Sequence, residues 1–193
     1  MEQKNYIVHP YKFNMWLFIL TLIMIFGGLT SAYIVSRSFT PLEKMIHFSL
    51  PSVLKFNTVI IIFSSISMQF SVWAAKKGDR MKALYGLMIT LVMGILFLAG
   101  QFNAFAHLTA GGLPFVDERR LDNSISFFYM FTGLHGLHIV GALVALLIGI
   151  IKTANNHFKP GGLKVTYEVI ATFWHFLGLL WVYLYLFLIY NQN

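Results

Sequence analysis

Apolar residues form five long runs along the chain, and short polar segments separate them. An α-helix needs about 20 predominantly apolar residues to cross the roughly 30 Å hydrocarbon core of a bilayer. Every run reaches that length, so the pattern predicts five transmembrane helices, at residues 14–36, 53–75, 83–107, 124–151 and 166–190. The predicted fold class is all-α, a polytopic membrane helical bundle that forms a single transmembrane domain over residues 1–193.

The basic residues of the polar segments predict how the bundle is oriented. Cytoplasmic loops of membrane proteins hold an excess of lysine and arginine. The N-terminal side carries nine of these residues and the opposite side five, so we expect the N-terminus in the cytoplasm and the C-terminus outside. The nine are Lys4, Lys12, Lys76, Lys77, Arg80, Lys82, Lys152, Lys159 and Lys164, and the five are Arg37, Lys44, Lys55, Arg119 and Arg120.

Composition agrees with lipid as the solvent of this chain. Hydrophobic residues make up 58% of it, charged residues only 11%, and the mean hydropathy is +0.70. A soluble domain of this size cannot bury so much apolar surface. The absence of cysteine excludes disulfides, thiolate metal sites, a cysteine nucleophile and a thiolate-bridged binuclear copper centre. The net charge of +7 does not indicate a nucleic-acid partner, because the basic residues lie in short loops between apolar runs.

Two histidines lie at membrane depth in the run at 124–151. His135 and His138 are three residues apart, so they lie on one side of a helix. The same side continues through the small residues Gly141, Ala145 and Gly149. Small residues let helix backbones approach closely in lipid. We therefore expect both imidazoles to point toward a neighbouring helix and the small residues to pack against it.

A similar stripe follows the run at 166–190. Glu168, Thr172, His175 and Gly178 recur at helical spacing. The last two runs are joined by a short connection, which makes them antiparallel neighbours. We expect this stripe to face a neighbouring helix, and we expect His138 and His175 to lie at comparable depth near mid-membrane.

We consider metal or haem binding, hydrogen bonds between helices, and contact with lipid or protons as roles for these histidines. A haem between helices needs one imidazole on each side of its iron, and an oxidase-type copper site needs three or more that converge. Here two of three candidates share one helix, and no carboxylate or thiolate joins them. Hydrogen bonds between helices, worth about 0.6–2 kcal/mol each, are the interpretation that the pattern favours. Bound lipid headgroups and a proton-conducting network are the alternatives.

Glu168 is the only acidic residue inside or at the edge of a predicted span. A carboxylate at the centre of a spanning helix costs about 2.5–3.5 kcal/mol, but the positive end of the helix dipole favours one near the helix start. We expect a dipole and packing role, with a lipid or water network as the alternative. Asn57 is expected to hydrogen-bond to a neighbouring helix.

No motif for catalysis is found in the sequence. It has no phosphate-binding loop, no G-x-S-x-G, no H-E-x-x-H and no paired carboxylates. It also lacks the interrupted helices with paired mid-membrane charges that are typical of ion-coupled carriers. A small transporter or a stand-alone membrane scaffold is the alternative of another class.

Short motifs in all five runs nevertheless form a consistent set. They are Met15-Trp16-Leu17-Phe18, Phe26-Gly27-Gly28, Ala32-Tyr33, Leu50-Pro51, Asn57-Thr58, Ser64-Ser65, Met68-Gln69, Lys77-Gly78-Asp79-Arg80, Gly100-Gln101, Thr132 to His138, and Trp174-His175-Phe176 with Trp181. In this order and spacing the chain resembles subunit III of the haem-copper oxidases, in its short five-helix bacterial form.

The resemblance implies a non-catalytic subunit of a respiratory terminal oxidase in the bacterial inner membrane. Such a subunit binds no haem or copper itself, packs on catalytic subunit I beside copper-binding subunit II, and holds structural phospholipids. It supports the aerobic electron transport and proton translocation of the complex. Longer relatives have two more N-terminal helices, so an equivalent pair is expected in the catalytic subunit. Other small membrane subunits, including a second subunit III-like protein, are further expected partners.

The chain also departs from the family pattern. Leu22, Ala104 and Gly178 stand where family members usually carry acidic residues. His135, His138, Trp174, His175 and Glu168 match the pattern and are carried over as structural or lipid-contact residues. Within the family, the resemblance leaves a quinol oxidase or a nitric oxide reductase-associated homologue as alternatives to a cytochrome c oxidase.

Overall fold

The computed structural model describes residues 10–41, 51–113, 115, 123–155 and 162–191, with side chains from 165 onward in the last segment. These residues form five helices: α1 Pro10–Ser38, α2 Val53–Lys76, α3 Arg80–Ala110, α4 Ser124–Ala154 and α5 Gly162–Tyr190. All five are long and apolar enough to cross a membrane, and no strand occurs in this part of the chain. The all-α membrane bundle is therefore confirmed, whereas the N-in orientation stays a prediction.

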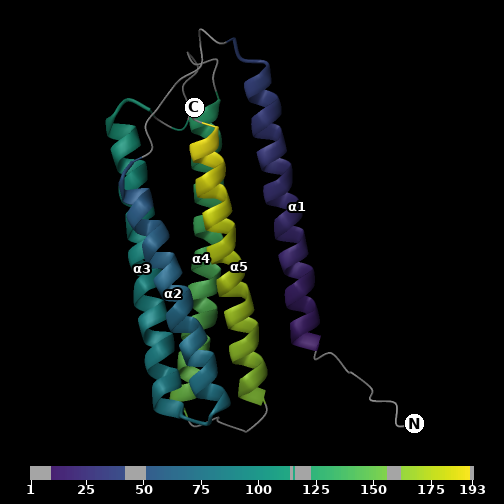
Figure 1. Ribbon diagram of the computed structural model, residues 1–193, viewed down its shortest axis with the longest axis vertical. Helices are drawn as coiled ribbons and strands as arrows, with labels where there is room; N and C mark the ends of the chain where they lie inside the picture. The colour runs from purple at the N-terminus through teal and green to yellow at the C-terminus, as the bar shows by residue number, and fades with distance from the viewer. Residues whose placement is uncertain (1–9, 42–50, 114, 116–122, 156–161, 192–193) are drawn as a thin grey trace, which may run out of the picture.

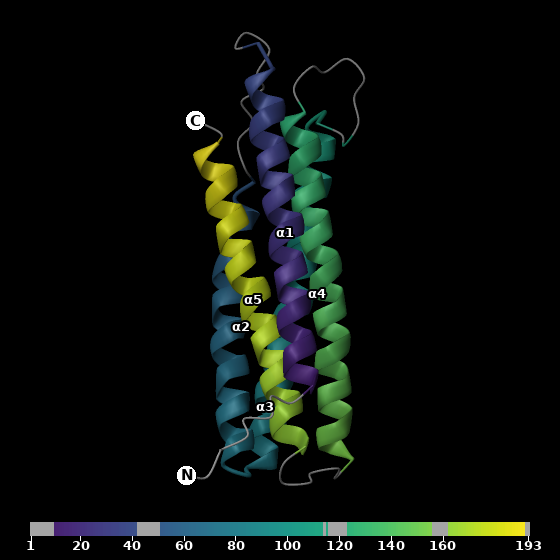
Figure 2. The ribbon, with the colours of Figure 1, turned by 90° about the vertical axis from the view of Figure 1, so that its right-hand side faces the viewer.

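The helices run up and down side by side, and the start of α1 and the end of α5 lie at opposite ends of the bundle (Figure 1). α2 packs on α3 and α5, and α4 packs on α3 and α5. Among the described residues α1 contacts only α4 and α5, and in Figure 2 it lies in front of them. α1 is thus an outer helix that leans on the last two.

The α2–α3 hairpin is closed by a tight turn and by a close backbone approach. Gly78 adopts a φ of 80°, a conformation that favours glycine, and the Asp79 carboxylate accepts a hydrogen bond from the Lys82 backbone N–H (3.2 Å). Further along, a Cβ on Gly86 would lie 2.9 Å from the Ser71 Cα. Gly86 therefore lets the two helices touch.

Serine hydroxyls hold the same two helices together. Ser71 Oγ donates to the Ala83 carbonyl (2.6 Å) and Ser67 Oγ donates to the Gly86 carbonyl (3.0 Å). Hydroxyls that donate to the carbonyls of a neighbouring helix are a common way to join helices where no water competes.

The interior is built around tryptophans of α5. Trp174 and Trp181 are fully buried, and their indole N–H groups donate to Ser64 Oγ and Thr58 Oγ1 of α2, both at 3.1 Å. Buried tryptophan usually finds such a partner for its N–H. Gly94 on α3 makes room for the Trp174 ring, because a Cβ there would lie 2.6 Å from the indole.

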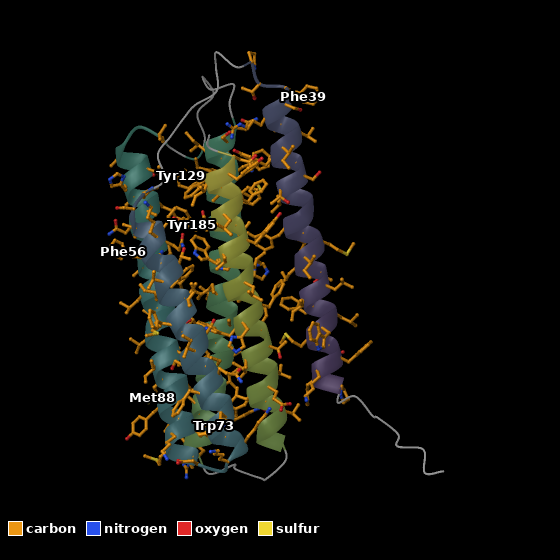
Figure 3. The ribbon with its side chains drawn as sticks, in the orientation of Figure 1. Phe39, Phe56, Trp73, Met88, Tyr129 and Tyr185 are labelled. Atoms are coloured by element: carbon orange, nitrogen blue, oxygen red, sulfur yellow. The ribbon has the colours of Figure 1, made fainter. Side chains whose placement is uncertain are left out.

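Large apolar side chains also cover the outside of the bundle. Phe39, Phe56 and Met88 are among those that are largely exposed (Figure 3). A soluble protein rarely exposes so much contiguous apolar surface, whereas a helix that faces lipid is apolar all round. The outer surface is thus made for acyl chains or for other membrane subunits.

Candidate functional site

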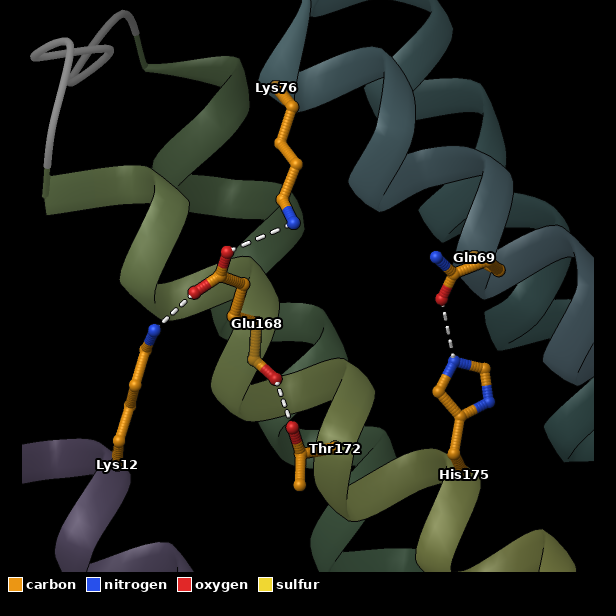
Figure 4. Close-up of polar contacts among 6 residues, drawn as sticks. All are labelled: Lys12, Gln69, Lys76, Glu168, Thr172 and His175. Atoms are coloured by element: carbon orange, nitrogen blue, oxygen red, sulfur yellow. Dashed lines mark hydrogen bonds and ion pairs between the residues drawn. The ribbon is translucent and has the colours of Figure 1, made fainter.

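Three helices contribute to a charged cluster at the end of the bundle where the described chain begins. The Glu168 carboxylate of α5 pairs with Lys12 Nζ of α1 at 2.5 Å and with Lys76 Nζ of α2 at 3.1 Å (Figure 4). The three side chains are partly exposed, so the cluster is open at the end of the bundle. Two lysines and one carboxylate leave it with a net charge of +1.

The role predicted for Glu168 at a helix start is wrong. α5 begins at Gly162, and its first turn contains no acidic residue. The helix dipole acts mainly on charges within the first turn, and Glu168 lies beyond it. The carboxylate is stabilised by its two lysines instead, and this is why it can lie in a spanning helix.

His175, two turns further along α5, contacts α2. Its Nε2–H donates to Gln69 Oε1 at 3.2 Å (Figure 4). At His175 the stripe therefore faces α2. Tyr167 and Ile170 occupy the side of α5 that meets α4: the Tyr167 hydroxyl bonds Thr153 Oγ1 (2.8 Å), and Ile170 lies 3.0 Å from the position of a Cβ on Gly149.

Two cavities adjoin along α2 and α5, and both are lined by Gln69 and His175. The first, of about 320 Å³, includes the charged cluster and Trp16 of α1. The second, of about 440 Å³, is lined mainly by apolar side chains and by Gly178. We call the two together the α2–α5 groove. The groove is amphipathic. It is cationic at the end of the bundle where the charged cluster lies, polar at His175, and apolar toward the middle of the bundle.

The other two histidines do not join this groove. The His135 ring is fully buried between Phe97 (ring centroids 5.8 Å apart) and Trp181 (5.3 Å). His138 is partly buried, and its Nδ1–H donates to the Leu134 carbonyl of its own helix (2.7 Å). Neither forms the predicted hydrogen bond to another helix within the described residues. Side chains three residues apart on a helix still differ in direction by about 60° around its axis. This difference directs His135 into the core and His138 toward α1.

The three imidazoles therefore diverge. His138 lies against Phe18 and Phe26 of α1, at ring-centroid distances of 6.4 and 6.1 Å, whereas His175 faces α2. Within the described residues, no group of three or more histidine, aspartate or glutamate side chains could hold a metal ion.

Of the residues predicted to pack between helices, some lie at a helix contact and one does not. Asn57 is buried, and its Nδ2 donates to the Phe97 carbonyl of α3 (3.3 Å). Gly149 lies against α5, and Ala145 is partly buried against the core. Gly141 is exposed, and a Cβ on it would meet no atom within 4 Å, so it is not at a helix contact within the described chain. It lies on the side of α4 turned away from its neighbours.

The sequence of this bundle matches a known family along its whole length. The family model described as cytochrome c oxidase subunit III covers residues 2–192. The chain belongs to this family. It is thus a member of a family of haem-copper oxidase subunits, as the resemblance predicted.

Named relatives agree with this assignment. A probable cytochrome c oxidase subunit 3 of Nocardia farcinica is 32% identical over 167 residues, which is 83% of this chain and 77% of the relative. The cytochrome c oxidase subunit 3 of Corynebacterium diphtheriae is 28% identical over 171 residues, 85% of this chain and 80% of the relative. That of Spodoptera frugiperda is 34% identical over 130 residues, 67% of this chain and 83% of the relative.

Three positions at which the subunit III pattern led us to expect acidic residues lie inside the bundle. Leu22 and Ala104 are fully buried. Because both side chains are apolar, neither position places a charge in the interior that would need a partner. Gly178 lines the α2–α5 groove, and a Cβ on it would lie 3.2 Å from Ser65 Oγ. The glycine therefore keeps the apolar half of the groove open.

Sequence reasoning missed the partners of Glu168 and His175. Lys12 and Lys76 were interpreted only as orientation signals, and Gln69 only as part of a short motif. The available signal was their place: both lysines lie at the same predicted side of the membrane as Glu168. Which helices approach that side together is a tertiary property that spacing along one helix does not contain.

Proposed function

We propose that this chain is the non-catalytic subunit III of a bacterial respiratory cytochrome c oxidase in the cytoplasmic membrane. The complex reduces oxygen and translocates protons, and its haem and copper are carried by catalytic subunit I and copper-binding subunit II. The observation that carries the proposal is the family match over residues 2–192, which includes all five helices. The printed names of the relatives favour cytochrome c over quinol as the electron donor of the complex.

The outer surface of α1 supports docking to other subunits. α1 touches only α4 and α5 within the described chain, and Trp16 and Met24 on it are 62% and 70% exposed. Within a membrane, such a helix is covered either by acyl chains or by another helix. We propose that catalytic subunit I and other small membrane subunits cover part of this surface.

We further propose that the α2–α5 groove holds a structural phospholipid. The net charge of +1 at Lys12, Lys76 and Glu168 suits a phosphate, since lysine ammonium groups attract anionic headgroups. His175 and Gln69 lie where the ester region of such a lipid would pass, and the apolar half beside Gly178 suits one acyl chain. The lining of the groove thus changes from charged through polar to apolar along its length. This change favours a lipid over a fully polar ligand.

The oxidase assignment is tested by purification. The chain is tagged and extracted in mild detergent, partners are identified by mass spectrometry, and a reduced-minus-oxidised spectrum is recorded. We expect an a-type haem signal together with a large multi-helix subunit and a copper-binding subunit. A b-type signal alone would assign the chain to a quinol oxidase or a nitric oxide reductase. Neither haem nor partner would refute the proposal and favour a transporter or scaffold.

The lipid site is tested on the same purified complex. We expect the Lys12→Ala/Lys76→Ala double variant and the groove-filling variant Gly178→Leu to lose phospholipid relative to the native complex, measured as bound lipid per complex. Lys77→Ala is the matched control, because Lys77 lies over the Trp73 ring (3.5 Å) outside the groove. Equal lipid content in all four samples would contradict the site.

A further inference from the structure

Two polar side chains inside the bundle have no hydrogen-bond partner among the described residues. They are Gln101 on α3, whose amide nitrogen and oxygen are both unpaired, and His135 on α4, whose two ring nitrogens are both unpaired. Gln101 is 3% exposed and His135 0%. Other buried polar side chains, such as Asn57, Ser64 and Ser71, are paired. Four unpaired atoms in one part of the core call for a physical cause, since buried polar groups in native proteins are hydrogen-bonded.

The register of α3 against α4 places the two side chains near each other. Phe97 of α3 packs edge-on to His135, and Phe105 of α3 packs on Phe128 two turns away on α4 (6.4 Å). Gln101 is one turn from both phenylalanines and is buried on the same side of α3. It therefore lies between these two levels, within about one helical turn of His135.

Among the described residues, the polar groups nearest to these two side chains along α3 and α4 are already bonded elsewhere. Thr132, which lies at this level of α4, donates its hydroxyl to the Phe128 carbonyl of its own helix (2.6 Å). The Asn57 amide is committed to the Phe97 carbonyl, and the Trp181 N–H is committed to Thr58. The walls that remain around His135 are the aromatic faces of Phe97 and Trp181.

We propose that Gln101 and His135 together hold internal water between α3 and α4. Water supplies two donors and two acceptors, and buried waters typically make about three hydrogen bonds to otherwise unpaired groups. One water accepts from the Gln101 amide N–H, donates to the His135 ring nitrogen that lacks a proton, and leaves a donor for the Gln101 oxygen or for a second water. The site is closed to lipid, because neither side chain reaches the surface.

The site is tested first by direct observation. The intact oxidase complex, with this subunit in place, is imaged by electron cryo-microscopy at a resolution that reveals ordered water. We expect density within hydrogen-bond distance of both the Gln101 amide and the His135 ring. A map that resolves other internal waters and shows none here would overturn the proposal.

Coupling between the two residues provides an independent test. We prepare Gln101→Leu, His135→Phe and the double variant, and we measure the temperature at which the subunit in the complex unfolds. With a shared water, each single variant leaves the other polar group and the water unsatisfied, so each lowers the midpoint by about 2–4 °C. The double variant then loses less than the two losses combined.

The control pairs Gln101→Leu with His138→Phe. His138 bonds within its own helix and faces α1, so these two losses should be additive. If instead the Gln101→Leu and His135→Phe effects add, or if each single variant raises the midpoint, the two side chains are unpaired and dry and the proposal is wrong. Should a variant fail to assemble, the map of the native complex still decides.

Discussion

Replacing Trp174 with phenylalanine tests how this bundle is held together in lipid. The Trp174 indole is fully buried, donates to Ser64 Oγ at 3.1 Å, and fills the space that Gly94 leaves on α3. Lipid is as apolar as the bundle interior, so little hydrophobic transfer energy is lost on substitution. What is lost is one hydrogen bond between helices and the packing of the larger ring.

The magnitude follows from these two losses. A hydrogen bond between helices in a membrane averages about 0.6 kcal/mol. A deficit of roughly 35 Å³ at about 24 cal/mol per Å³ adds about 0.8 kcal/mol. For a chain of this length, a loss of about 1.4 kcal/mol lowers the unfolding midpoint by about 3–6 °C.

The assay is the midpoint of thermal aggregation of the tagged, detergent-solubilised protein, followed by size-exclusion chromatography. Trp73→Phe is the matched control, because Trp73 lies on α2 and is 51% exposed; it should change the midpoint by little. Ser64→Ala removes the acceptor of the indole N–H, together with a bond to the Ile61 carbonyl of its own helix, but keeps the Trp174 ring in place. A Trp174→Phe midpoint equal to that of Trp73→Phe would refute the reasoning.

Three further substitutions probe other contacts. His138→Leu removes an imidazole that packs on α1, so we expect weaker association of the subunit with the complex but unchanged haem content in the catalytic subunit, measured by co-purification and absorbance. Arg80→Met removes the hydrogen bonds that the Arg80 guanidinium donates to the end of α4, from Nε to the Thr153 carbonyl (2.8 Å) and from Nη2 to the Ala154 carbonyl. It should cost about 1 kcal/mol or more in the free energy of unfolding, whereas Lys77→Met removes only the exposed contact with the Trp73 ring and should lower the midpoint less. Hydrogen bonds from Lys82 hold the pKa of Asp79 below its usual range. The stabilisation is therefore complete above the unfolded pKa of about 3.9 and is lost as the pH falls through the lower folded value. Asp79→Asn should flatten that acid-dependent fall in the midpoint, and an unchanged fall would show that another group causes it.

The positions of the helices could be predicted from the sequence, because a long run of apolar residues is what allows a helix to cross the lipid bilayer. Each predicted span lies inside an observed helix, and the helices extend past it by up to four residues. The extra residues include charged ones, such as Lys12 in α1 and Arg80 in α3. A hydropathy pattern stops at such residues, whereas the backbone hydrogen bonds of the helix continue through them.

The site was predicted only in part, because every side of a helix in lipid can be apolar. The pattern brought out Glu168 and His175 as one stripe, but it did not reveal which helix that stripe meets. In a soluble protein the polar side of a helix faces water. In a membrane a polar side chain indicates a contact with another helix, but it does not tell which helix that is. The same ambiguity explains why Gly141 was expected at a contact and lies outside it.

The position of α1 has a consequence for how the chain is made. α2 and α3 are consecutive and form a hairpin as soon as both are synthesised, but α1 has its only described contacts with α4 and α5. More than 120 residues separate the end of α1 at Ser38 from the start of α5 at Gly162. At about 5–20 residues per second, the ribosome needs roughly 6–25 s to supply that last partner. Until α4, its other partner, has been inserted, α1 stands in the bilayer without a described contact, and its retention there depends on its own hydrophobicity.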